Sequence, residues 1–331
     1  MKETTWTPGS LLQISGSYWQ SATLHAAVKL DIFQLLGAKN LSASEVATSL
    51  EADTGACQLL LDALCAMELL KKSASTYGNS EFSSSYLDTG SPTNLCDIIM
   101  HHQNLYAAWG QLDLSVREGE PRREGASDGD EEQRKNFLMG MHNLASLTAP
   151  AIAAQIDLGG YEHLLDLGGG PGTFALHFCQ KNPELQAIVY DLPTSRPFAE
   201  QVARQMGLQN SVSFQEGDFT RSEIEGSYDV AWLSHILHGE DEEACRMIIE
   251  KAVACLRPGG RILIHEFILN NEKDGPLFPA LFSLNMLLNT PGGRSYSEAE
   301  LFEMLRDTGV QKLEHLSLDI PGFSSVISGE V

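Results

Sequence analysis

The sequence predicts an α/β protein whose main domain is a doubly wound, mostly parallel β-sheet. From residue 163 onward, strand-like apolar runs alternate with helical segments. The first run ends in Asp166 and is followed by four glycines within residues 168–172 and then by a helical pattern. Strand, glycine turn and helix are typical of a nucleoside-cofactor loop at the carboxyl edge of a parallel sheet. The last two strand-like runs, over 311–318 and 322–329, have no helix between them and predict a terminal antiparallel hairpin.

Composition indicates a globular protein and excludes some partners. Hydrophobic residues make up 43% and charged residues 20% of the 331 positions. The 44 acidic and 22 basic residues give a net charge of −22, which repels phosphate backbones and anionic lipids, so we expect no nucleic-acid or membrane partner. The amino terminus lacks a signal pattern and the six cysteines form no CxxC pair. We therefore expect a cytoplasmic protein with reduced cysteines.

The amino-terminal region has a helix, helix and hairpin pattern. Apolar residues recur near the helical period, which predicts helices over 10–36, 42–50 and 54–70. Gly37 is a predicted C-cap, and Ser42 and Glu45 have capping-box spacing. The polar run 76–80 then predicts a hairpin turn. This order is typical of a winged-helix module.

A winged helix raises the alternative of a ligand-sensing regulator that binds DNA. Such a protein needs a basic recognition helix, but residues 54–70 contain neither Lys nor Arg. A structural or dimerising role is the favoured interpretation.

The domain boundary is predicted where composition changes. Residues 92–118 have a helical pattern, residues 119–132 are rich in Gly, Pro and charge, and residues 137–156 are helical again. We divide the chain into domains 1–115 and 116–331. His101 lies on the first of these helices, as a solvated helix residue or a substrate contact.

The glycine loop does not fit a dinucleotide or a nucleotide triphosphate. Strands are expected over 163–167, 185–190, 211–215, 228–233 and 260–267. In a G-x-G-x-x-G fingerprint that starts at Gly168, the third glycine falls on Thr173. No Gly-Lys-Ser/Thr follows, so the phosphate loop of nucleotide triphosphatases is excluded. Asp191 at the end of the second strand can accept hydrogen bonds from both hydroxyls of a ribose.

The string from Asp166 to Gly172 resembles motif I of S-adenosylmethionine-dependent methyltransferases. With Asp191-Leu192-Pro193, the segment 232–242 and the segment 256–261, nearly the whole chain is similar to the caffeate-, hydroxyindole- and polyketide-type small-molecule O-methyltransferases. The resemblance implies a class I methyltransferase fold, Rossmann-like with the terminal hairpin, behind a mainly helical winged-helix dimerisation domain. It also implies a homodimer, a small-molecule substrate, S-adenosylmethionine as the methyl donor and S-adenosylhomocysteine as the product.

The resemblance also implies roles for individual residues. His238 is the general base and Glu266 orients it, because a phenol of pKa about 10 needs a base to become a good nucleophile. The implied cofactor contacts are Asp166, Gly168, Gly170, Asp191, Leu192, Asp218, Phe219 and Ser234. The implied substrate contacts are Met286, Asn289, His101 and Trp109.

The chain departs from the family in two places that bear on the chemistry. Gly239-Glu240 replaces the usual Asp-Trp, and Ser295 stands where a second catalytic acid is usual. O-methylation is therefore the first interpretation, with C-methylation or a cofactor-binding homologue without methyl transfer as the alternatives. His235 is expected to be a packed or capping residue. No metal site is expected, because nothing near His235 and His238 obviously supplies further zinc ligands.

Overall fold

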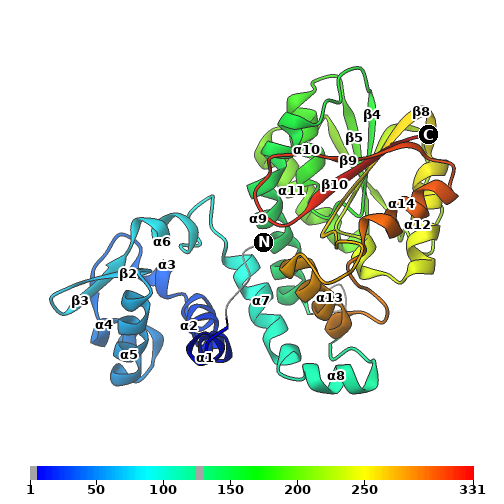
Figure 1. The fold of residues 1–331 in the computed structure, drawn as a ribbon. Coiled ribbons are helices and arrows are strands. Elements are labelled where there is room, and N and C mark those ends of the chain that lie inside the picture. The colour runs from blue at the N-terminus through cyan, green and yellow to red at the C-terminus, as the bar shows by residue number, and fades with distance from the viewer. Residues whose placement is uncertain (1–5, 124–129) are drawn as a thin grey trace. The chain divides into compact units, whose positions relative to one another are not determined.

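A computed structural model describes residues 6–123 and 130–331. The chain separates into two compact units, Met1–Leu105 and Tyr106–Val331, and Figure 1 draws both. The sequence predicted this division later, at residue 115. Within the described ranges, no helix is both long and apolar enough to cross a membrane.

The first unit is mainly helical. Its elements are α1 (Pro8–Gly16), α2 (Tyr18–Lys29), α3 (Ile32–Leu36), β1 (Leu41–Ser42), α4 (Ala43–Leu50), α5 (Thr54–Ala66), β2 (Leu70–Ser73), β3 (Thr76–Asn79) and α6 (Glu81–Tyr86). The single helix predicted over 10–36 is wrong: the chain breaks at Ser17, which ends α1, and again at Asp31, whose φ of 52° is left-handed. Gly37 is the C-cap of α3, as predicted.

Two features that the sequence predicted from neighbouring residues, a capping box and a hairpin, are present in this unit. Ser42 and Glu45 form the predicted capping box. The hairpin exists, but its turn lies at 74–75 rather than 76–80, with Ala74 at a φ of 53°. The strands form a small antiparallel sheet in the order β1-β3-β2. The winged-helix assignment stays a prediction.

The second unit holds the seven-stranded sheet. Helix α7 (Cys96–Trp109) crosses the boundary between the units, and α8 (Leu112–Glu118) and α9 (Glu131–Gln155) follow it in the second unit. The predicted helix 92–118 is interrupted near Gly110. Part of the predicted loop 119–132, residues 124–129, lies outside the described residues. The strands are β4 (His163–Leu167), β5 (Gln186–Asp191), β6 (Val212–Glu216), β7 (Tyr228–Ser234), β8 (Leu256–Glu266), β9 (Gln311–Leu316) and β10 (Ser325–Glu330).

The strand order is β6-β5-β4-β7-β8-β10-β9. Strands β4 to β8 pair in parallel, and β10 pairs antiparallel with both β8 and β9. This confirms the doubly wound sheet and the terminal hairpin. Helices α10 (Thr173–Lys181) and α11 (Arg196–Met206) pack with α9 against one face, whereas α12 (Glu242–Ala254) and α14 (Glu298–Asp307) cover the other.

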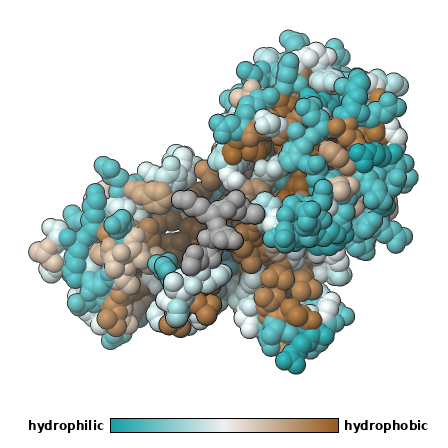
Figure 2. All heavy atoms as spheres, in the orientation of Figure 1, coloured by the Kyte–Doolittle hydropathy of each residue, from teal (hydrophilic) through white to brown (hydrophobic). Residues whose placement is uncertain are grey.

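Burial on both faces explains why the central strands are almost continuously apolar. Residues 230–233 of β7 and 262–264 of β8 are fully buried. Hydrophilic residues cover most of the visible face of this unit (Figure 2). The carboxyl ends of the five parallel strands meet at one edge, which is where such sheets bind ligands.

We expect Gly172→Ala to destabilise the protein more than Gly207→Ala. The φ angles of Gly172 and Gly207 are 73° and 70°, so alanine costs about 1–2 kcal/mol of backbone strain at each site. A Cβ at Gly172 would also lie 2.8 Å from Val189 Cγ2, whereas nothing lies within 4 Å at Gly207. Thermal denaturation of the ligand-free variants measures the difference. Equal losses in Tm would contradict the close packing of the glycine loop on β5.

Candidate active site

The glycine loop needs bare backbone at several positions. Gly168, Gly170 and Gly172 all have left-handed φ values of 66°, 52° and 73°. A Cβ on Gly168 would lie only 2.5 Å from Ile236 Cγ2. Glycine relieves both constraints because it has no Cβ. The loop joins the end of β4 to the first turn of α10, so it presents open backbone at the sheet edge.

Asp166 lies beneath this loop with an unused oxygen. Its side chain is 1% exposed. Oδ2 accepts a 3.4 Å hydrogen bond from the Ala175 N–H, whereas Oδ1 is buried and has no partner. Burial raises the pKa of Asp166 to about 7. A buried acceptor without a donor is costly, so Asp166 is suited to a cationic or hydrogen-bonding ligand group.

Asp191 clamps the loop to the end of β5. Its Oδ2 accepts a 2.7 Å hydrogen bond from the Gly170 N–H, and its Oδ1 accepts from the Leu192 N–H at 2.7 Å and the Ser195 hydroxyl at 2.8 Å. Burial raises the pKa of Asp191, although these hydrogen bonds oppose that effect. Each carboxylate oxygen has two lone pairs, so Oδ2 keeps capacity for a ligand hydroxyl.

Three other predicted cofactor residues already contact groups within the protein. Asp218 Oδ1 accepts from the N–H and hydroxyl of Thr220 at 2.9 and 2.6 Å, which is a local turn of the kind aspartate forms. Ser234 at the end of β7 hydrogen-bonds His265 Nδ1 at 2.9 Å. Phe219 lies against Gly168, since its Cε1 would be 3.1 Å from a Cβ there.

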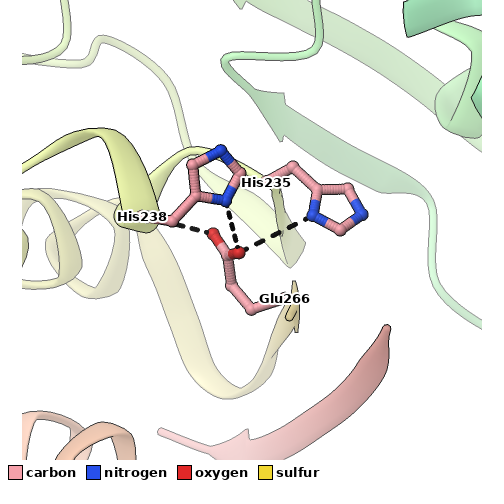
Figure 3. Close-up of side chains that lie close together, drawn as sticks. All are labelled: His235, His238 and Glu266. Carbon is pink, nitrogen blue, oxygen red and sulfur yellow. Dashed lines mark hydrogen bonds and ion pairs between the residues drawn. The ribbon is translucent and has the colours of Figure 1, made fainter. Parts of the chain in front are cut away.

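The structure brings His238 and Glu266 together (Figure 3). His238 sits in the short 3-10 helix η2 (Leu237–Gly239), and Glu266 is the last residue of β8. His238 Nδ1 and Glu266 Oε2 are 2.7 Å apart. Glu266 Oε1 accepts from the backbone N–H groups of Leu237 at 3.0 Å and His238 at 3.3 Å. One carboxylate therefore holds both the turn and the ring.

Glu266 is ionised although it is only 4% exposed. Burial alone would raise its pKa, but the imidazole of His238, which hydrogen-bonds it, and the nearby imidazole of His235 hold that pKa well below its usual value. An ionised carboxylate accepts the proton of Nδ1, which leaves the lone pair of the imidazole on Nε2. This is the tautomer that a general base requires.

His235 lies on the other side of the same carboxylate. Its backbone has a left-handed φ of 56°. The ring packs 4.4 Å from the ring of His265 and 4.3 Å from that of Phe267. Its Nδ1 is buried without a hydrogen-bond partner and lies 3.6 Å from Glu266 Oε2. Burial lowers the pKa of His235.

His265 is fully buried and points to the opposite side of β8 from Glu266. It hydrogen-bonds Ser234 through Nδ1 and Ser324 through Nε2, the latter at 2.7 Å. Its ring stacks on Trp232 at 5.4 Å. Burial holds the pKa of His265 well below its usual value. The neutral ring joins the ends of β7 and β8 to the segment before β10.

An aromatic cluster beside His238 was missed by the sequence reading. The Phe282 ring lies 4.7 Å from the His238 ring, edge to face, and 4.6 Å from that of Phe267. Phe278 contacts Phe267 at 4.9 Å. Phe278 and Phe282 lie one turn apart on α13 (Leu277–Asn289), and this spacing on an apolar helix was the available signal.

The predicted substrate residues are divided between the units. Met286 is buried on α13. Asn289 Nδ2 donates to the Asn285 carbonyl at 2.6 Å, and Trp109 Nε1 donates to Asn285 Oδ1 at 3.1 Å. His101 belongs to the first unit and is buried there.

Ser295 does not replace the missing acid. It is buried, its N–H donates to the Ser283 hydroxyl at 3.1 Å, and its own hydroxyl has no partner. The segment before it packs directly on the backbone of His238, because a Cβ on Gly293 would lie 2.4 Å from the His238 carbonyl oxygen. Glu266 is thus the carboxylate that orients the His238 ring.

Two family models match this chain. The model of an O-methyltransferase domain matches residues 114–311, and that of an O-methyltransferase dimerisation domain matches residues 12–89. The chain is 30% identical to a 3-hydroxy-5-methyl-1-naphthoate 3-O-methyltransferase of Streptomyces sahachiroi, over 97% of this chain and 95% of that protein. It is 30% identical to the acetylserotonin O-methyltransferase of Gallus gallus, over 93% of each.

A solved structure resembles the whole chain. Human N-acetylserotonin methyltransferase in complex with S-adenosylmethionine has 27% identity and a TM-score of 0.86, over 100% of this chain and 99% of that one. This likeness over the whole chain agrees with the two matched domains. The chain therefore belongs to the small-molecule O-methyltransferase family that pairs an O-methyltransferase domain with an O-methyltransferase dimerisation domain.

Proposed function

We propose that this protein transfers a methyl group from S-adenosylmethionine to a hydroxyl of a small aromatic molecule, with His238 as the general base. The observation that carries the proposal is the 2.7 Å contact between His238 Nδ1 and the buried carboxylate of Glu266. The relatives that methylate a naphthoate hydroxyl and acetylserotonin support the reaction class.

The cofactor residues fit a methyl donor with a charged amino-acid end. The unpartnered Oδ1 of Asp166 can accept a hydrogen bond from an ammonium group, and Asp191 Oδ2 can accept one from a ribose hydroxyl. Gly168 and Gly170 leave the backbone open beside them. When bound, S-adenosylmethionine supplies an electrophilic methyl group on its sulfonium.

The protein's own groups prepare the acceptor. Glu266 accepts a hydrogen bond from the Nδ1–H of His238, so Nε2 is free to take the proton of the substrate hydroxyl. The carboxylate then stabilises the resulting imidazolium. The rings of Phe267 and Phe282 beside His238 offer apolar faces to an aromatic acceptor. Holding the oxygen in line with the methyl group supplies much of the rate.

The alternative is C-methylation, or a cofactor-binding homologue without methyl transfer. The unpartnered hydroxyl of Ser295 favours it, because this position has lost the second acid. An assay of methyl transfer to a panel of phenols, which includes 3-hydroxy-5-methyl-1-naphthoate and N-acetylserotonin, distinguishes O-methylation, C-methylation and the absence of methyl transfer.

We expect His238→Ala to lower kcat/KM on the best acceptor of that panel by about 100-fold or more, because the hydroxyl loses its base. Affinity for S-adenosylhomocysteine, measured by calorimetry, should stay unchanged. His315→Ala, at an exposed histidine on β9, is the control. Wild-type turnover in His238→Ala would show that positioning alone drives the reaction.

Binding of S-adenosylhomocysteine should strengthen as pH rises towards and through about 7. In the free protein, burial raises the pKa of Asp166 to about 7, so the carboxyl is protonated below that pH. An ammonium group pairs only with the ionised form, hence affinity falls as pH falls. Calorimetry from pH 5.5 to 8 should show this dependence in the wild type and a weaker, flatter one in Asp166→Asn. Equal profiles would remove Asp166 from the cofactor site.

We also propose that the first unit makes the protein a homodimer and that it covers the partner's substrate site. The dimerisation-domain match supports this, as do large apolar side chains left exposed on α1 and α2, namely Leu11, Leu12, Ile14 and Trp19. Exposed apolar patches of this kind mark interfaces.

The double variant Leu12→Asp, Trp19→Asp should be monomeric by light scattering at micromolar concentration, because each charge would be buried unpaired in the interface. Leu59→Asp, at an exposed leucine on α5, is the matched control and should remain dimeric. A wild-type monomer would overturn the proposal.

A further inference from the structure

We propose that His235, His238 and Glu266 also form a three-ligand site for a transition-metal ion of the Zn²⁺ class, and that the bound ion holds the enzyme inactive. One donor atom from each residue lies within 4.8 Å of the other two. Both imidazoles are directed at the same carboxylate (Figure 3). The sequence predicted no metal here because no third ligand was visible near the two histidines, but Glu266 arrives from the neighbouring strand β8.

The donor set suits the ion chemically. Two imidazole nitrogens and one carboxylate oxygen are ligands that Zn²⁺ uses in sites with three protein ligands and one open position. The open position would take water or the hydroxyl of an acceptor.

The two spacings that involve Glu266 need little adjustment. Zinc lies about 2.0–2.2 Å from its ligands, so the ligands of a tetrahedral site are about 3.4 Å apart. Glu266 Oε2 and His235 Nδ1 are already 3.6 Å apart. Glu266 Oε2 and His238 Nδ1, at 2.7 Å, need to separate by less than about 1 Å as the ion replaces their hydrogen bond.

The position of His235 is otherwise unexplained. Its Nδ1 is buried without a hydrogen-bond partner, which is unfavourable unless a ligand satisfies it. Its backbone is left-handed, with a φ of 56°, and such strain gathers at functional sites. The packing of its ring against His265 and Phe267 fixes the nitrogen beside the carboxylate.

Metal binding and base catalysis exclude each other at His238. A neutral imidazole that binds an ion through Nδ1 carries its proton on Nε2 and has no lone pair left for a substrate proton. The ion also takes the carboxylate that would stabilise the imidazolium. Inhibition therefore rests on the proposed function, whereas metal binding itself does not.

The test uses the full-length protein after chelator treatment. Zn²⁺ is titrated by calorimetry and Co²⁺ by visible absorption, and we expect a single tight site with the strong visible bands of tetrahedral Co²⁺. His235→Asn removes one ligand and suits the left-handed backbone, and its Tm verifies the fold. Loss of a mere outer-shell partner costs 10–100-fold in metal affinity, so we expect this variant to bind Zn²⁺ at least about 100-fold more weakly. His315→Asn, at a surface histidine paired with Glu298, should bind as the wild type does.

Absence of tight binding, or equal affinity in the wild type and His235→Asn, would overturn the metal site and leave the base proposal standing. In parallel, Zn²⁺ should inhibit methyl transfer in step with the occupancy seen by calorimetry. Each protein is compared with its own metal-free rate, and His235→Asn should need a correspondingly higher Zn²⁺ concentration. Full activity with the site occupied would instead confirm the metal site and contradict His238 as the base.

Discussion

The site depends on one buried carboxylate. Glu266 is charged and almost fully enclosed, and such a group is stable only when its oxygens are hydrogen-bonded. The backbone N–H groups of Leu237 and His238 and the ring of His238 supply those bonds. The shape of the η2 turn and the orientation of the His238 ring therefore have the same physical cause. A group that competes for the carboxylate, such as a metal ion, would therefore change both the turn and the orientation of the ring.

Close backbone approach sets where that turn lies. On one side, Gly168 leaves room for Ile236, and on the other, Gly293 lets the segment after α13 rest on the His238 carbonyl. A side chain at either glycine would push the turn away from the sheet edge. His238 is thus fixed between the glycine loop and the segment that carries Ser295, and Glu266 is the carboxylate that contacts its ring.

The sequence predicted the parts of this site that follow from local pattern. Strand β4 has the bounds expected from its apolar run. Alternation with helices predicted the parallel sheet, and the lack of a helix between the last two strand-like runs predicted the hairpin. The partners of Ser234 and His235 could not be predicted, because they depend on how strand ends meet in space. The break of the first helix at Asp31 was missed for a similar reason: a left-handed residue in an apolar repeat leaves no periodic signal.

The tautomer of His238 tests the central claim most directly. Nitrogen NMR of the imidazole side chains, with His238 assigned by substitution, distinguishes a protonated Nδ1 from a protonated Nε2 in the neutral ring. Orientation by Glu266 predicts the proton on Nδ1 and a free lone pair on Nε2. A neutral ring protonated on Nε2 would contradict it, because the carboxylate would then not be holding a base ready for the substrate hydroxyl.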